Sequence, residues 1–102
     1  MINSHLMKKY FVPFTGETPA SITVNGHRLV ILTQDKEALE ESLGFIGADH
    51  IETVRTGRTQ RDDKREFDRI ATLARGGVVV APYGAHVQEI IRNLEAELPW
   101  LQ

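Results

Sequence analysis

Three arginines recur at every third position in one polar segment: Arg55, Arg58 and Arg61. A guanidinium group presents a planar fork of N–H donors that matches the two oxygens of a carboxylate or of a phosphate edge. The spacing therefore predicts a loop that binds a small anion. The alternative is that these arginines are solvated or pair with the acids that follow directly, Asp62 and Asp63.

A second candidate segment, Pro82 to His86, follows the most apolar run of the chain. Tyr83 offers a ring and a hydroxyl, and Gly84 opens a predicted helix whose free N–H groups suit an anion. His86 is the weak candidate for a general acid or base, because histidine titrates near neutral pH. The alternative is that Tyr83 only packs at a strand end. We expect this segment to meet the arginine loop and Thr33–Asp35 at the carboxyl ends of parallel strands.

Neither a metal nor an organic cofactor is expected. The histidines outside the first residues, His27, His50 and His86, are scattered, and no His-Glu-x-x-His pattern is present. His50 and Glu52 stand two residues apart on a predicted strand, which offers two ligands at most. The chain has no cysteine, and no serine lies in a nucleophile turn. The sequence therefore favours a protein that is not an enzyme, without deciding the question.

Composition predicts an ordinary soluble protein. The chain has 102 residues, of which 41% are hydrophobic and 25% charged, with a formal net charge of -2. This charge argues against a nucleic-acid partner, because binding one requires a basic face. No apolar run approaches the roughly 18 residues of a membrane span, so no membrane association is expected. The lack of cysteine fits a reducing compartment, and we expect a cytoplasmic protein.

The chain is expected to begin its folded part after a short leader. Residues 1–7 precede Lys8 and end on a second methionine, Met7, so they are expected to be an expression remnant or a disordered leader. Residues 8–102 contain no linker, repeat or low-complexity stretch and are predicted to form a single α/β domain.

Hydrophobic patterning predicts an N-terminal strand and a β-hairpin. The pair Asn25-Gly26 accepts the positive φ angles of a tight hairpin turn. The predicted elements of this half are a strand at Tyr10–Phe14, a turn at Thr15–Pro19, the hairpin strands Ser21–Val24 and His27–Leu32, and a helix at Lys36–Leu43 that Asp35 caps and Gly44 ends.

The second half alternates strands with helices. Thr59 and Asp62 approximate a capping box, and Val78–Ala81 has no polar face, as expected of a central strand covered on both sides. The predicted elements are a strand at Ile51–Val54, a helix that Gly76-Gly77 stops, the Val78–Ala81 strand, and a last helix from about Gly84 to Leu98. The predicted fold is α/β at the boundary with α+β. It has a single-layer mixed sheet of about five strands, with the N-terminal strand and hairpin followed by α-β-α-β-α and the helices packed on the sheet.

Apolar residues near the two ends of the domain predict self-association. The residues expected at such an interface are Tyr10, Phe11, Phe14, Trp100 and Leu101. The alternative for Trp100 is that it folds back onto its own core. The leading hypothesis is thus a non-catalytic interaction module that forms a homo-oligomer.

Two other functions stay open. One is a small enzyme or ligand-binding domain for a phosphorylated or carboxylated metabolite, which would use the arginine loop and a helix N-terminus as its anion site. The other is a protein that masks a basic partner with the acidic segment Asp35–Glu52, which holds six acids and one base.

Overall fold

A computed structural model describes residues 8–57 and 59–101 as a mixed sheet with helices on both faces. Its elements are β1 (Lys9–Thr15), β2 (Thr18–Pro19), β3 (Ile22–Val24), β4 (His27–Thr33), α1 (Lys36–Glu40), α2 (Leu43–Ile46), β5 (His50–Arg55), α3 (Gln60–Ala74), β6 (Gly77–Ala81) and α4 (Val87–Glu97). The predicted fold class is confirmed. The strand beyond the expected five is β2, a short partner for the end of β1 in the segment predicted as a turn.

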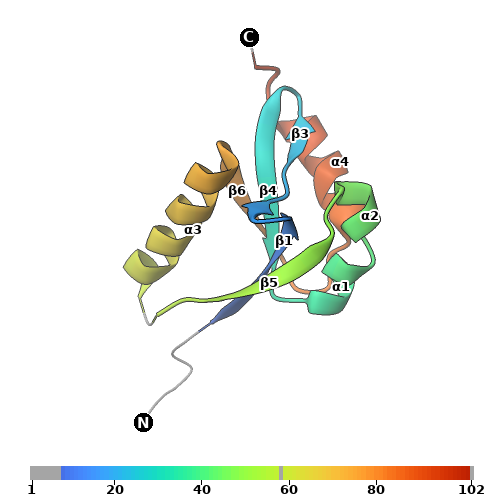
Figure 1. Cartoon of the computed structure of the whole chain (residues 1–102). Helices are drawn as coiled ribbons and strands as arrows, with labels where there is room; N and C mark the ends of the chain where they lie inside the picture. Colours follow the sequence, from blue (N-terminus) through green and yellow to red (C-terminus); the bar gives the residue numbers. More distant parts are fainter. Residues whose placement is uncertain (1–7, 58, 102) are drawn as a thin grey trace.

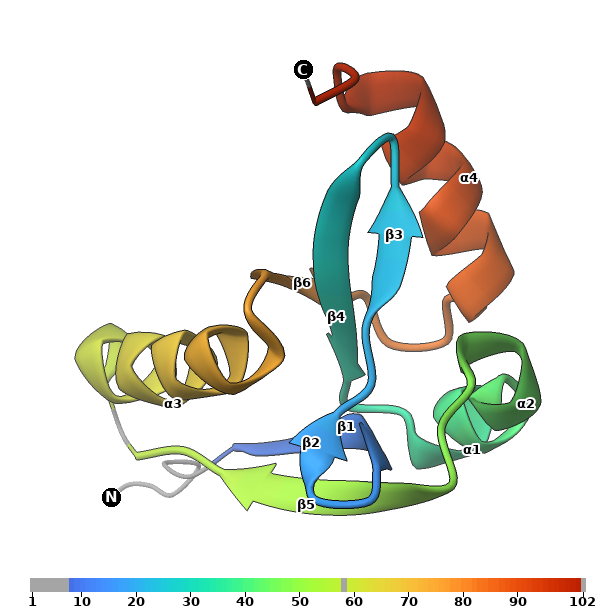
Figure 2. The same cartoon turned by 45° about the horizontal axis from the view of Figure 1, so that its top comes forward.

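The sheet has two wings that meet at one residue pair. In the first wing, β5 runs antiparallel to β1 along its whole length. In the second, β4 pairs antiparallel with β3 and parallel with β6. The wings join where Phe11 of β1 lies opposite Thr33 of β4. Figure 2 shows β1 and β5 running across the lower end of β4, so the sheet changes direction sharply at this junction.

The strand order differs from the expected parallel arrangement of the strands that precede Thr33–Asp35, the arginine loop and Pro82–His86. β5 lies next to β1 and not next to β4 or β6, so β1 separates the strands that were expected to be neighbours. The prediction that Val78–Ala81 is a central strand is also wrong. Among the described strands, β6 pairs only with β4, and the side chain of Val80 is 42% exposed.

The core is divided between the two faces of the sheet. Figure 1 shows α3 on one side and α1, α2 and α4 on the other. Side chains alternate along β4, so Val30 and Leu32 pack on the α3 side while Ile31 packs against Leu39 and its neighbours. The α3-side cluster comprises Tyr10, Val12, Val30, Leu32, Val54, Ile70 and Ala74. The opposite cluster comprises Ala20, Ile31, Leu39, Ile46, Ala81 and Val87.

Local signals in the sequence are confirmed at three element ends. Asn25 and Gly26 both adopt positive φ angles, 51° and 86°, as a tight hairpin turn requires. The side chain of Asp35 caps α1 by accepting a hydrogen bond from the backbone N–H of Ala38. Thr59 and Asp62 form the predicted reciprocal capping box at the start of α3.

Two helix ends differ from the prediction. The expected helix over Lys36–Leu43 is split into α1 and α2, and the left-handed residue that ends α2 is Gly47, not Gly44. Phe45 does not fold back onto the core, since it is 58% exposed.

The end of α3 also differs from the prediction, although glycine is required at the next position. Arg75, with φ 58°, is the left-handed residue that ends this helix, where Gly76 was expected to stop it. A Cβ atom on Gly76 would lie 2.3 Å from the carbonyl oxygen of Arg28, so only glycine fits where the chain enters β6. In the described part of the chain, no helix has the length and apolar character that crossing a membrane requires.

Candidate functional site

The structure places two of the three predicted arginines at one end of the first wing. Arg55 is the last residue of β5, and Arg61 lies in the first turn of α3, both exposed. Arg58 lies outside the described residues. Arg55 stands directly opposite Lys9 in the β1–β5 ladder. Two like charges in a direct cross-strand pair repel each other, so an anion at this position would stabilise the pair.

The segment Pro82–His86 lies elsewhere on the molecule. Tyr83 is exposed, Gly84 is left-handed with φ 83°, and His86 is the N-cap of α4 without a capping hydrogen bond from its side chain. The imidazole Nδ1 of His86 lies 3.9 Å from a carboxylate oxygen of Glu41, at the end of α1.

The expected convergence of three loops at one site is therefore wrong. Both Figure 1 and Figure 2 separate the end of β5 and the start of α3, where Arg55 and Arg61 lie, from the β6–α4 connection that includes Tyr83 and His86. The physical reason is the interposed β1 and the change of direction at the Phe11–Thr33 pair. Of the strands that the structure describes, only β4 and β6 pair in parallel, so only the loops after these two follow parallel strands.

Three of the five residues predicted for an interface are occupied in packing. Tyr10 is buried in the α3-side cluster, where its ring meets Phe67 edge-on at a centroid distance of 5.1 Å. Phe11 and Phe14 are half-buried and pack against opposite core clusters. The reason is that β1 lies inside the sheet, with β5 on one side and β2 and β4 on the other, and is not an edge strand.

Trp100 remains exposed, at 73%, on a backbone that the hairpin turn holds in place. The backbone N–H of Leu101 donates to the carbonyl of Asn25 (2.9 Å), and the Nε2 atom of His27 lies 2.8 Å from the carbonyl oxygen of Pro99. Both chain neighbours of Trp100 are thus hydrogen-bonded. The alternative that Trp100 folds back onto its own core does not describe this arrangement.

The side chain of Asn25 also holds the end of α4. Its Nδ2 atom donates to the carbonyl oxygens of Leu98 (2.7 Å) and Glu95 (3.0 Å). The last carbonyls of a helix have no partner within the helix, so these bonds satisfy groups that would otherwise face solvent. The residue that forms the hairpin turn therefore also fixes the C-terminal tail.

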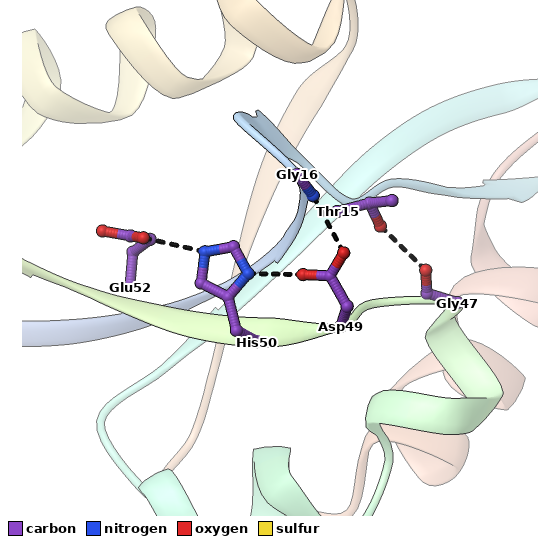
Figure 3. Close-up of polar contacts among 6 residues, drawn as sticks. All are labelled: Thr15, Gly16, Gly47, Asp49, His50 and Glu52. Atoms are coloured by element: carbon purple, nitrogen blue, oxygen red, sulfur yellow. Dashed lines mark hydrogen bonds and ion pairs between the residues drawn. The ribbon is translucent and has the colours of Figure 1, made fainter.

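A polar cluster that the sequence suggested only in part surrounds His50. Figure 3 shows the imidazole between two carboxylates: Nδ1 is hydrogen-bonded to Asp49, and Nε2 lies 2.8 Å from Glu52. Asp49 also accepts a hydrogen bond from the backbone N–H of Gly16 at 3.0 Å. The His50–Glu52 spacing was visible in the sequence, but the roles of Asp49 and Gly16 depend on the β1–β2 turn folding over β5.

The two carboxylates change the ionisation of this cluster. Hydrogen bonds that the His50 ring donates to Asp49 and then to Glu52 raise the pKa of His50 above its ordinary value of 6.5. The imidazole of His50, followed by the N–H of Gly16, lowers the pKa of Asp49. Because both ring nitrogens are engaged, His50 has no free lone pair with which to act as a general base.

Beside this cluster, the α3 side of the sheet contains a cavity of about 390 Å³. It lies between β5, the second half of α3 and the β1–β2 turn, and its lining includes Phe14, Glu17, Glu52, Val54, Arg69 and Leu73. Within the described residues, no group of three or more histidine, aspartate or glutamate side chains is arranged to hold a metal ion.

Comparison with known proteins does not add a family to this description. No family model, no curated protein and no solved structure matches the chain.

Proposed function

We propose that this protein is a cytoplasmic, non-catalytic interaction module that self-associates through its C-terminal tail, with Trp100 as the anchor. The observation that carries the proposal is a tryptophan 73% exposed between two hydrogen-bonded neighbours. A large side chain on a fixed backbone loses less conformational freedom on binding than one on a mobile tail. Tryptophan is also among the residues most enriched at the energetic centres of interfaces.

A second copy of the chain is the partner that this surface suits. Trp100 and Leu101 are adjacent, apolar and exposed, and a two-fold contact would bury both side chains of each copy against the same patch of the other. Twofold pairing of one patch is the commonest way in which oligomers form.

Because Trp100 is the only tryptophan of the chain, the fluorescence of the protein reports on the surroundings of this one side chain. We expect sedimentation to show a dimer that forms with rising concentration, accompanied by a blue shift of the tryptophan emission. Trp100→Ala should weaken dimerisation by about 2 kcal/mol or more, which is roughly thirtyfold in dissociation constant.

The matched control is Phe45→Ala, which removes another exposed aromatic, on α2. It should leave dimerisation unchanged. A wild-type chain that stays monomeric at the highest concentration, or equal weakening by both substitutions, would rule out this interface.

A second candidate function is the binding of a phosphorylated or carboxylated metabolite near Arg55, and the like-charged Lys9–Arg55 pair favours it. We expect added inorganic phosphate to raise the melting temperature of the wild-type protein. Arg55→Gln should abolish this effect, whereas Arg92→Gln, which removes an exposed arginine on α4, should keep it. An equal response of all three proteins would exclude this site.

A further inference from the structure

The cavity beside β5 has the size of a small-molecule site. Its volume of about 390 Å³ falls within the roughly 300–1,000 Å³ typical of ligand pockets. It is formed by elements far apart in the sequence, since Phe14 comes from β1, Glu52 from β5 and Leu73 from α3.

One part of the cavity is apolar. Phe14, Val54 and Leu73 line it. Leu73 is 49% exposed, although Ile70 and Ala74 of the same helix are buried against the sheet. The protein itself leaves this leucine in contact with water. The apolar part of a ligand bound in the cavity would cover it, which is favourable.

The charged groups of the cavity leave an excess of negative charge. The guanidinium of Arg69 is already engaged, because its Nε and Nη2 atoms donate to Glu66 at 3.2 and 3.0 Å. Glu52 uses one oxygen, Oε2, in its contact with His50. Glu17 makes no hydrogen bond or ion pair with any described residue, so no cation in the described part of the chain neutralises its carboxylate.

One of the two carboxylates is held in position before any ligand binds. His50 contacts Glu52 through Nε2, and its ring packs on Phe14 with a centroid distance of 5.7 Å. Figure 3 shows that Asp49 holds the other side of the same imidazole. A binding group fixed by its neighbours loses little freedom when a ligand arrives, which favours affinity.

We propose that this cavity binds a small organic ammonium ion, in which a primary amine is attached to an apolar body. The ammonium group would lie between the carboxylates of Glu17 and Glu52, and the apolar body would cover Phe14 and Leu73. This site is separate from the tail surface around Trp100, and its occupation does not depend on self-association.

The probe is 2-phenylethylamine, which combines an ammonium group with an aromatic body. Added to the ¹⁵N-labelled full chain, it should cause saturable shifts of the amide signals of Gly16, Thr53 and Leu73. The analogues 2-phenylethanol and 3-phenylpropanoate keep the ring but lack the ammonium group, and we expect them to bind at least tenfold more weakly.

Variants then assign the binding to the two carboxylates. Glu52→Gln and Glu17→Gln should each weaken the binding of 2-phenylethylamine by about tenfold, whereas Glu95→Gln, which removes an exposed acid on α4, should not. Both target carboxylates are exposed, so folding is expected to survive, and the amide spectrum verifies it. Absence of a saturable shift at millimolar amine, equal binding of 3-phenylpropanoate, or unchanged binding by both Gln variants would overturn the proposal.

Discussion

At the scale of single residues, His50 links the ionisation of the protein to its fold. Its pKa is raised in the folded state, so its contribution to stability is fully present below 6.5, the unfolded value, and is lost as pH rises through the folded pKa. The pKa of Asp49 is lowered in the folded state. Its contribution to stability is therefore present above pH 3.8, the unfolded pKa, and is lost as pH falls through the folded pKa. The pair therefore stabilises the β1–β2 turn over the mildly acidic range between these limits.

We expect an NMR titration of the His50 ring to give a midpoint above 6.5, because two carboxylates favour the imidazolium. Asp49→Asn and Glu52→Gln should each move the midpoint down towards 6.5. Glu89→Gln, which removes an exposed acid on α4, should leave it unchanged. A wild-type midpoint at or below 6.5 would mean that the two hydrogen bonds do not form in solution.

At the scale of elements, the β3–β4 hairpin turn has a second role as the support of the C-terminal tail. Gly26 has a positive φ, and a Cβ atom at this position would lie 3.0 Å from the Cβ of Leu101. Gly16, in the β1–β2 turn, also has a positive φ, but a Cβ there would meet nothing within 4 Å. An alanine at Gly16 therefore tests only the free-energy cost of the left-handed backbone. An alanine at Gly26 adds the cost of displacing the tail.

Substitution of either glycine by alanine should destabilise the protein. We expect Gly16→Ala to cost about 1–2 kcal/mol, the usual penalty of a left-handed non-glycine residue. Gly26→Ala should cost more and should also change the tryptophan emission of the dilute protein, because the tail must shift. Urea denaturation measures the loss of stability in both variants, and fluorescence measures the change in tryptophan emission. Equal losses and an unchanged emission would show that the turn does not support the tail.

Element ends could be predicted from the sequence wherever the chemistry is local. Asn25-Gly26, Asp35 and the Thr59–Asp62 box each act within a few residues, so their neighbours in the chain suffice to identify them. The split between α1 and α2 was missed because Gly44 and Gly47 both suit a helix end. Which of them is used depends on packing that the local sequence does not contain.

At the scale of the whole molecule, the strand order and the positions of the loops could not be predicted from the sequence, because they depend on pairing between distant strands. An apolar run such as Val78–Val80 fits both a central and an edge strand, and only the pairing of β6 with β4 alone distinguishes them. The insertion of β1 between β4 and β5 likewise separates the arginine loop from the loop of His86. The sequence left open whether Trp100 is exposed or folds back onto the core, and the cavity could not be predicted because it forms where three distant segments meet.

The parallel pairing of β4 with β6 also sets an order of events during synthesis. Val30 finds its partner only when Val78 has left the ribosome, after the whole of α3. Until then, one edge of β4 has open hydrogen-bonding groups and apolar side chains, a state in which strands readily join other chains. A nascent chain interrupted before Gly77 would keep this edge open permanently, so truncated products should aggregate where the full chain does not.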